Sequence, residues 1–417
     1  MANTNTLGEI LTTLFDRRPF SRRVSDARPI EELCKVLLTE KTEASGVQLA
    51  TAALNRYRHL GPDEKVAFFN FLNTEMDVDA VLIGNAATAY QLDKSAENFV
   101  ALSRACEPAR HEIFRRLNQA PGATAELVNM RVDLLSCLKD SPELARTDHD
   151  LVHLLRSWFN RGFLVLRQIT WDTPASILEK IIAYEAVHEI HTWDDLRRRL
   201  HPQDRRCFAF FHPAMPDEPL IFVEVALTKG VPGSIQKVLA DTREVTEETE
   251  VDTAVFYSIS NCQDGLAGIS FGNSLIKQVA RDLAIDVPNL KTFVTLSPIP
   301  GLMRWLNDRG LTDAASDADN LKRLAASYLL DAKKPDGKPL DPVARFHLGN
   351  GALVHAVHLE ADTSENGQRQ SGGVMVNYLY DLSKISQNLQ LFINKKEVAA
   401  TSAVKTLARQ APKKSAA

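Results

Sequence analysis

Residues 253–296 read TAVFYSISNCQDGLAGISFGNSLIKQVARDLAIDVPNLKTFVTL, and this stretch decides the fold of the second half of the chain. It opens with an apolar, partly β-branched run at 253–259 that predicts a strand, followed by a loop with three glycines. A helix is predicted from about 273 to 283 and a second strand at 292–296. A strand, a helix and a strand in this order predict two parallel strands joined by a right-handed crossover.

The segments on either side of this unit extend the same pattern. Residues 163–170 (FLVLRQIT) predict a strand, and Thr173-Pro174 predicts the start of a helix. Residues 207–211 (CFAFF) and 220–227 (LIFVEVAL) flank a segment rich in turn residues, so we expect an antiparallel hairpin. Beyond 297 the pattern is helical to about 331, and the tail from about Val398 is expected to fray.

The first part of the chain, from about residue 29 to 161, has a helical pattern with few β-branched runs. Thr124 is the expected N-cap of one helix, and a second apolar stripe from Leu151 to Phe159 ends before Gly162, a residue typical of helix C-termini. A chain of 417 residues also exceeds the usual size of a single core. We therefore predict a helical bundle over 1–161, joined to an α/β domain with a mixed sheet over 162–417.

Composition excludes several functional classes. The formal net charge is −4 with both signs mixed along the chain, which predicts neither nucleic-acid nor membrane-surface binding. No apolar run is long enough to span a bilayer, and no secretory h-region is present. The five cysteines lack the spacings of structural zinc sites, so we expect reduced thiols, a cytoplasmic location and no metal site.

The glycine loop is the first candidate binding site. Glycines let a backbone approach a ligand closely, and consecutive N–H groups before a helix suit a pyrophosphate. The loop lacks the GK[ST] ending of ATP-binding loops and the GxGxxG spacing of dinucleotide folds, and a plain turn is the alternative reading. The residues expected to bind the ligand are Gln263, Gly265, Gly268, Ser270, Gly272 and Asn273.

Five motifs carry a family resemblance. In chain order they are HPAMPDEPL at 212–220, FYSIS at 256–260 with the glycine loop, LSPIPG at 296–301, FHLGNGA at 346–352 and VMVNY at 374–378. Together they resemble malonyl-CoA decarboxylases over roughly 170 residues. The resemblance implies an N-acetyltransferase-like fold for the second half, and an enzyme that converts malonyl-CoA to acetyl-CoA and CO2.

The resemblance also implies roles for individual residues. The family's catalytic serine falls on Ser297 and its catalytic histidine on His347, while Ser258, Asn377 and Tyr378 fall on positions near the substrate. The glycine loop is expected to hold the coenzyme A pyrophosphate. Animal members carry a glutamate at the loop position where this chain has serine, so the resemblance does not extend to a carboxylate acting on Ser297.

The chemistry fits these residue types without a metal or an organic cofactor. The thioester itself can accept the electrons released when CO2 leaves, provided that hydrogen-bond donors stabilise the enolate oxygen. A histidine with its ordinary pKa near 6.5 could supply the proton at neutral pH. His188 and His191 are spaced by three residues, but no third metal ligand accompanies them.

Each catalytic candidate also has an ordinary structural reading. Ser297 could bond its own backbone before Pro298, His347 could be a buried strand histidine, and Tyr378 could be a core tyrosine. Two other functions stay open on the residues alone: an acyl-CoA-dependent N-acyltransferase and a malonyl-CoA-binding protein without turnover. The amphipathic helical half is expected to drive self-association into a dimer or tetramer.

Overall fold

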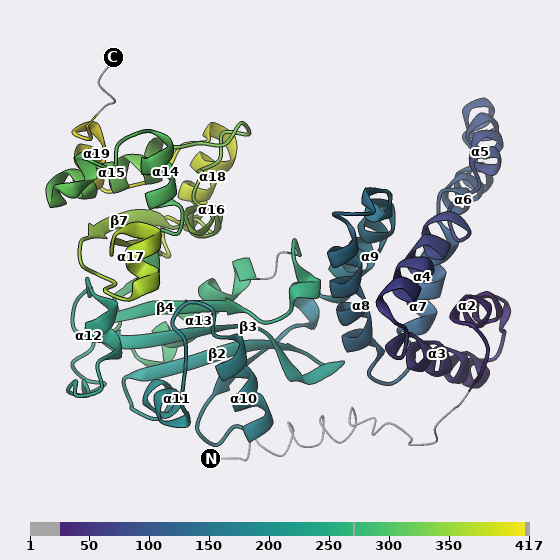
Figure 1. The fold of residues 1–417 in the computed structure, drawn as a ribbon, viewed down its shortest axis with the longest axis horizontal. Coiled ribbons are helices and arrows are strands. Elements are labelled where there is room, and N and C mark those ends of the chain that lie inside the picture. Colours follow the sequence, from purple (N-terminus) through teal and green to yellow (C-terminus); the bar gives the residue numbers. More distant parts are fainter. Residues whose placement is uncertain (1–25, 270–271, 413–417) are drawn as a thin grey trace. The chain divides into compact units, whose positions relative to one another are not determined.

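The computed structural model describes residues 26–269 and 272–412, which fall into two compact units (Figure 1). The helical unit runs up to Val165 and also includes Phe211–Glu218 and Gln263–Ile269. The α/β unit comprises Leu166–Phe210, Pro219–Cys262 and Ser270–Ala417. The tip of one hairpin and most of the glycine loop therefore belong to the helical unit, although the sequence around them is that of the α/β half.

The helical unit is built on buried aromatic and aliphatic side chains, including Phe68, Phe69, Phe114, Leu127 and Leu151. Local signals set several helix starts; for example, Glu64 accepts the Gly61 N–H at 2.7 Å just before α4. The α-helices of this unit are α2 (Ile30–Thr39), α3 (Glu43–Arg58), α4 (Pro62–Thr74), α5 (Ala80–Leu92), α6 (Ala96–Ala105), α7 (Ala109–Leu117), α8 (Ala123–Cys137) and α9 (Ala145–Trp158).

Two predicted helix ends differ from the structure. The N-cap of α8 is Gly122, which has a φ of 75°, and Thr124 lies inside the helix with its hydroxyl donating to Asn118 Oδ1 at 2.9 Å. The C-cap of α9 is Phe159, and Gly162 lies in a short 3-10 helix. The prediction that Thr124 is the N-cap was wrong. Thr124 is the second residue of α8, and a threonine so close to a helix start resembles an N-cap as long as the partner of its hydroxyl is unknown.

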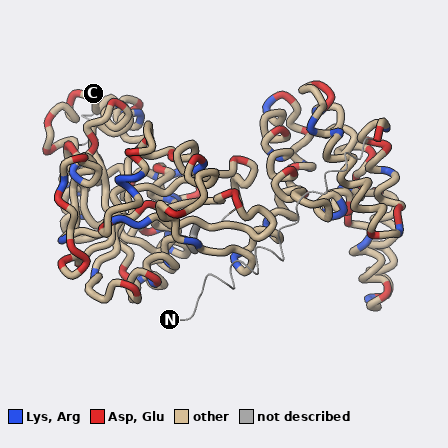
Figure 2. Tube along the Cα trace, turned by 90° about the horizontal axis from the view of Figure 1, so that it is seen from below, with Lys and Arg blue, Asp and Glu red and all other residues tan. Residues whose placement is uncertain are grey.

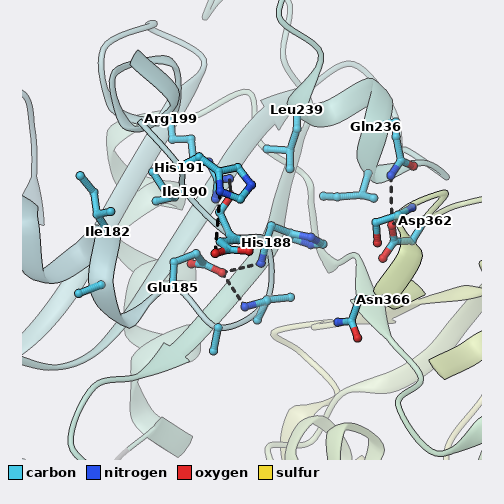
Figure 3. A pocket seen from close by; sticks show the side chains of 16 residues that line it. Ile182, Glu185, His188, Ile190, His191, Arg199, Gln236, Leu239, Asp362 and Asn366 are labelled. Atoms are coloured by element: carbon cyan, nitrogen blue, oxygen red, sulfur yellow. Dashed lines mark hydrogen bonds and ion pairs between the residues drawn. The ribbon is translucent and has the colours of Figure 1, made fainter. Parts of the chain in front are cut away.

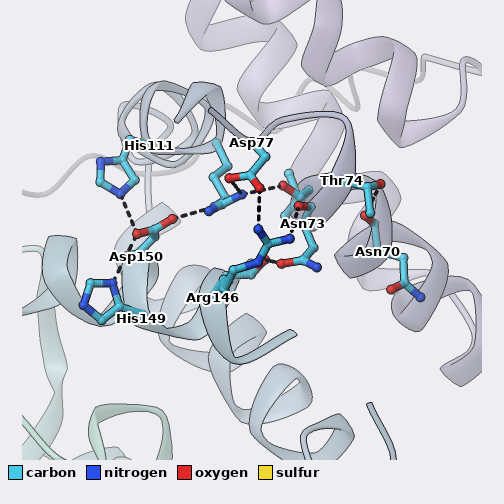
Figure 4. Close-up of polar contacts among 11 residues, drawn as sticks. Asn70, Asn73, Thr74, Asp77, His111, Arg146, His149 and Asp150 are labelled. Atoms are coloured by element: carbon cyan, nitrogen blue, oxygen red, sulfur yellow. Dashed lines mark hydrogen bonds and ion pairs between the residues drawn. The ribbon is translucent and has the colours of Figure 1, made fainter. Parts of the chain in front are cut away.

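A buried ion network ties the helical unit together (Figure 4). The Arg110 guanidinium is almost completely buried and contacts Asp77 at 2.9 Å and Asp150 at 2.5 Å. Burial acts to raise the pKa of Asp150, but hydrogen bonds from His111 and Arg110 outweigh it and hold that pKa below its usual range. Because removal of one partner from a buried pair leaves the other charge unpaired, this network fixes the packing of α7 against α9.

The α/β unit contains a mixed sheet of order β1-β2-β3-β4-β5-β8-β6, with β7 also paired to β8. β4 and β5 are parallel, as predicted, and α13 (Gly272–Asp286) connects them. The strands are β1 (Val165–Ile169), β2 (Arg205–His212), β3 (Met215–Thr228), β4 (Thr253–Asn261), β5 (Thr292–Thr295), β6 (Ser297–Pro298), β7 (Leu353–His358) and β8 (Met375–Leu379). The fold class predicted from the sequence, a helical domain followed by an α/β domain with a mixed sheet, is confirmed.

β4 and β5 separate at a position that the sequence explains. Their pairing ends at Phe256 and Thr295, and the last bond runs from the Leu296 N–H to the Phe256 carbonyl at 3.0 Å. The next N–H that the β5 segment could donate to β4 in a parallel ladder would be that of residue 298, which is a proline and has none. Ser297 and Pro298 pair instead with β8, so β4 continues beyond Phe256 without β5 beside it.

The remaining helices pack around the sheet and position the loops of the α/β unit. They are α10 (Ala175–Tyr184), α11 (Trp193–Leu200), α12 (Ile235–Leu239), α14 (Leu302–Asp308), α15 (Ala318–Asp331), α16 (Pro342–Gly349), α17 (Glu365–Ser371), α18 (Ile385–Lys395) and α19 (Ser402–Arg409). The frayed tail predicted from Val398 is wrong up to Arg409. Thr401 caps α19, Val404 is buried, and the Val354 N–H donates to the Ala399 carbonyl at 2.9 Å.

Charged residues of both signs are interspersed over each unit, without a large region of one sign (Figure 2). Among the described residues, none of the helices has the length and apolarity required to cross a membrane. All five cysteines are free. The mixed charges agree with the absence of a long-range electrostatic field inferred from the sequence.

Candidate active site

Ser297 and His347 lie fifty positions apart in the sequence and are brought into contact by the α/β unit. The distance between Ser297 Oγ and His347 Nε2 is 3.2 Å. Ser297 comes from β6, where β5 and β4 have just separated, and His347 comes from α16. Their exposed fractions are 5% and 2%, so the pair is shielded from solvent and its polar interactions are strengthened.

The helix that carries His347 has a well-defined start. Asp341 is completely buried, and its Oδ1 accepts the Ala344 N–H at 2.8 Å, while Pro342 occupies the first helical turn. Burial raises the pKa of Asp341 to about 6 although backbone N–H groups lower it. The expectation that His347 might be an ordinary strand histidine is therefore wrong, because FHLGNGA forms the end of a capped helix and the turn after it.

Two further hydrogen bonds extend the pair at both ends. The Ser297 hydroxyl donates to Thr295 Oγ1 at 2.8 Å, and His347 Nδ1 lies 2.8 Å from the Tyr380 hydroxyl. Tyr378 stacks on the imidazole of His347, with ring centroids 4.6 Å apart. The sequence motifs included Tyr378 but missed Thr295 and Tyr380. Residues two positions apart in a strand lie on the same face, so the spacing of Thr295 from Ser297 and of Tyr380 from Tyr378 could have indicated both partners.

Burial changes the acid–base character of the histidine. It lowers the pKa of His347 to about 3, whereas the sequence suggested a histidine with an ordinary pKa that could protonate an intermediate near pH 7. A histidine with so low a pKa is neutral at pH 7 and carries one N–H. In this environment the neutral ring of His347 can donate one hydrogen bond.

Replacing His347 by glutamine is expected to weaken the acid sensitivity of folding. The folded chain keeps His347 neutral down to about pH 3, while the unfolded chain binds a proton near pH 6.5. Because the unfolded state binds more protons between these values, the free energy of unfolding falls as the pH drops. Between pH 7 and pH 5 this histidine should account for roughly 2 kcal/mol of that fall. Urea unfolding of both proteins at the two pH values measures it, and equal losses would contradict the expectation.

Asn377 and Tyr378 occupy different surroundings. Asn377 is completely buried, and its amide donates to the Thr295 carbonyl at 2.8 Å while its Oδ1 contacts His358 Nε2. It therefore holds β8 against β5 near the pair. The Tyr378 ring faces His347, and its buried hydroxyl has no hydrogen-bond partner among the described residues.

Ser258 belongs to a second polar cluster. Its hydroxyl donates to the Glu185 carboxylate, with distances of 2.8 and 2.7 Å to the two oxygens, and Ser260 also contacts this carboxylate. Glu185 also accepts the backbone N–H groups of Val187 and His188 at 2.8 Å each. The carboxylate therefore connects the segment after α10 to the part of β4 that has no neighbouring β5.

The second polar cluster borders a cavity of about 770 Å³ in the α/β unit (Figure 3). His188, Arg199, Gln236 and Asp362 line it together with Glu185. Arg199 is already paired at 3.0 Å with Glu224, whose pKa burial raises to about 7 although Arg199 lowers it. Ser297 and His347 do not line this cavity. The structure thus brings Asn377 and Tyr378 to the Ser297 and His347 pair, and places Ser258 at a separate cluster.

The glycine loop is anchored to helix α8 of its own unit. The Arg131 guanidinium donates to the carbonyls of Gly265 and Ala267 at 2.7 and 2.8 Å, and a Cβ at Gly265 would lie 2.0 Å from the Val128 carbonyl oxygen. Gly265 is therefore required for close packing on α8. Gly268 has a φ of 77° and open space around it, which leaves its backbone accessible.

The other predicted loop residues are only partly described. Gln263 precedes the short 3-10 helix Asp264–Leu266, and Gly272 and Asn273 are the first two residues of α13. Ser270 lies outside the described residues. Within the described ranges there is no group of three or more His, Cys, Asp or Glu side chains arranged to hold a metal ion.

Family models match both halves of the chain. The malonyl-CoA decarboxylase C-terminal domain matches residues 162–318 and 307–417, and the malonyl-CoA decarboxylase N-terminal domain matches residues 76–159. Among curated proteins, the mitochondrial malonyl-CoA decarboxylase of Anser anser anser is 35% identical over 73% of this chain and 70% of its own length. The mitochondrial enzyme of Rattus norvegicus is 32% identical over 74% and 73%, respectively.

Solved structures agree with the sequence matches. The malonyl-CoA decarboxylase from Rhodopseudomonas palustris is 49% identical with a TM-score of 0.85, covering 90% of this chain and 98% of that one. The malonyl-CoA decarboxylase from Agrobacterium vitis is 47% identical with a TM-score of 0.86, covering 91% and 99%. The motifs, the fold and these matches to both halves agree, and the chain belongs to the malonyl-CoA decarboxylase family.

Proposed function

We propose that this chain decarboxylates malonyl-CoA at the pair Ser297 and His347, with the His347 N–H as the hydrogen-bond donor and Ser297 holding the imidazole in place. The bond between the malonyl methylene carbon and its carboxylate breaks, CO2 leaves, and the electron pair passes to the thioester oxygen as an enolate. The enolate carbon then takes up one proton to give acetyl-CoA. The 3.2 Å contact inside a buried site supports this proposal, because donors shielded from water stabilise a developing oxyanion by about 3 kcal/mol each.

The edge of β4 that is not paired with β5 is a suitable binding site for the extended arm of the substrate. Beyond Phe256, β4 has no β5 beside it, and an arm that contains amide groups can pair with a free strand edge. In this proposal the edge of β4 binds the pantetheine arm. Independently of β4, the sequence of the glycine loop favours the backbone around Gly268 as a pyrophosphate site. Gln263, Gly272 and Asn273 would contribute at the two ends of that loop.

The test of the proposed function is incubation of the purified full-length chain with malonyl-CoA, with CO2 and acetyl-CoA measured separately. Equal amounts of both products without an added amine are expected. CO2 release that depends on an amine would point to acyl transfer, and tight binding without products would point to a binding protein. We also propose that no metal or organic cofactor takes part, so turnover should survive exhaustive treatment with a chelator.

We further propose that the chain acts in the cytoplasm and self-associates through α5 and α6. The five free cysteines fit a reducing compartment. None of the α5 residues is buried, although this helix is rich in apolar residues, and Phe99 on α6 is 55% exposed. A helix of this length is marginal in water without packing, and an uncharged apolar patch is complementary to a copy of itself. The exposed apolar side chains on these helices are Val81, Leu82, Leu92, Phe99 and Val100.

The combined substitution Leu82→Glu and Phe99→Glu is expected to lower the mass of the particle in solution. Two carboxylates on this patch would have to be desolvated on association, which opposes it. Light scattering of the full-length chain measures the mass. Ile285→Glu is the matched control, because Ile285 is 76% exposed on the α/β unit, and it should leave the mass unchanged. An unchanged mass in the double variant would locate self-association elsewhere.

A further inference from the structure

The hydrogen bonds around His347 form one continuous chain of four side chains. From one end to the other they are Tyr380, His347, Ser297 and Thr295, with distances of 2.8, 3.2 and 2.8 Å between successive polar atoms. All four side chains are buried. The direction of donation in such a chain decides which nitrogen of His347 carries its single proton.

Thr295 is the residue that can set this direction. It is completely buried, and its Oγ1 accepts the Ser297 hydroxyl at 2.8 Å and the Tyr378 backbone N–H at 3.1 Å. The Ser297 hydroxyl has only one proton, which is used in the bond to Thr295. Ser297 Oγ must then accept from its other neighbour, so His347 Nε2 must be the nitrogen that carries the hydrogen.

The other end of the chain is consistent with the same direction. If the proton of His347 is on Nε2, its Nδ1 is an acceptor and the Tyr380 hydroxyl donates to it across 2.8 Å. We propose that Thr295 is a positioning residue which, by accepting the Ser297 hydroxyl, holds His347 as the Nε2–H tautomer. This inference rests on the proposed function, because it assigns a role within the same pair.

The direction has a chemical consequence for the reaction. With its hydrogen on Nε2 and directed at Ser297, His347 cannot remove the proton of Ser297 and activate it as a nucleophile. The pair is then arranged for donation, and a thioester oxygen that comes within reach can replace or share Ser297 Oγ as the acceptor of the Nε2–H. The reaction proceeds without an acyl-serine: the carbon–carbon bond to CO2 breaks, its electron pair passes through the enolate to the methylene carbon, and that carbon forms its new carbon–hydrogen bond with a proton taken up from solvent water.

The direct test is the ¹⁵N NMR spectrum of His347 in the full-length enzyme without substrate. We expect a protonated Nε2 and an unprotonated Nδ1 in the wild type and in Thr295→Ser, which keeps the hydroxyl. Thr295→Val has nearly the same shape but no acceptor, so the Ser297 proton should turn toward Nε2 and the hydrogen of His347 should move to Nδ1. A wild-type protein with the hydrogen on Nδ1, or Thr295→Val with the wild-type tautomer, overturns the proposal.

Kinetics separate this inference from the proposed function. In Thr295→Val, kcat should fall by about tenfold or more, as expected when one oxyanion donor is lost, while the KM for malonyl-CoA changes less than about threefold. Thr295→Ser should recover most of the kcat. If His347→Ala retains wild-type turnover, the proposed catalytic role of the pair fails whatever the tautomer is. If Thr295→Val does not fold, the wild-type spectrum still decides the tautomer.

Discussion

Ser297→Ala and His347→Ala are each expected to lower kcat by roughly 10²-fold or more while the Kd for malonyl-CoA changes only about threefold. The two side chains touch at 3.2 Å, and the proposed mechanism places both of them at the same enolate. Residues that act as a unit are strongly non-additive, so the double variant should lose little more than either single variant. Single-turnover kinetics and equilibrium binding measure the two quantities.

Two outcomes would change the assignment of the pair. If Ser297 and His347 acted independently, the fold losses in kcat of the two single variants would multiply in the double variant. This outcome would argue against a joint role. Wild-type kcat in a folded His347→Ala protein would return this histidine to a packing role. Ser297→Thr is the conservative variant and should retain more activity than alanine, because its hydroxyl can still bond to His347 and Thr295.

Arg131→Met is expected to destabilise the helical unit by about 3 kcal/mol and to weaken the binding of coenzyme A esters by about tenfold or more. The guanidinium is buried and satisfies two loop carbonyls as well as Asp148, which it contacts at 2.8 Å. Methionine keeps part of the side-chain volume but leaves these groups without a partner. Urea unfolding and titration with acetyl-CoA measure the two effects.

Arg156→Met is the matched control for Arg131→Met. Arg156 also reaches the loop, but it is exposed and its contact with the Gly268 carbonyl is 3.3 Å long. Its loss should cost less than about 0.5 kcal/mol. Unchanged coenzyme A affinity in a folded Arg131→Met protein would mean that the loop conformation held by this arginine is not the one that binds the pyrophosphate.

The sequence predicted those features that depend on local pattern. The alternation of apolar residues at 253–259 and 292–296, with a helix between them, was sufficient for the parallel pair β4 and β5. The family motifs were sufficient to name Ser297 and His347, which the structure brings into contact. These predictions needed only spacing along the chain and residue type.

Other features depended on contacts that no local pattern reveals. The partners Thr295 and Tyr380 look like ordinary strand residues until the fold places them beside the pair. The lowered pKa of His347 follows from complete burial, which depends on all the elements that pack around α16. The close packing of Gly265 on α8 was also hidden from the sequence, because its neighbour Val128 is more than one hundred positions away along the chain.

The separation of β4 from β5 at Pro298 has a consequence for how this protein avoids misassembly. An unpaired strand edge at the outside of a sheet attracts other polypeptides and is a common origin of aggregation. Here the unpaired edge lies between two strands of one sheet, and β3 covers the opposite side of β4 through residues Ile221 to Thr228. A proline in the neighbouring strand thus creates an edge inside the sheet, where a narrow extended ligand can pair but a second sheet cannot.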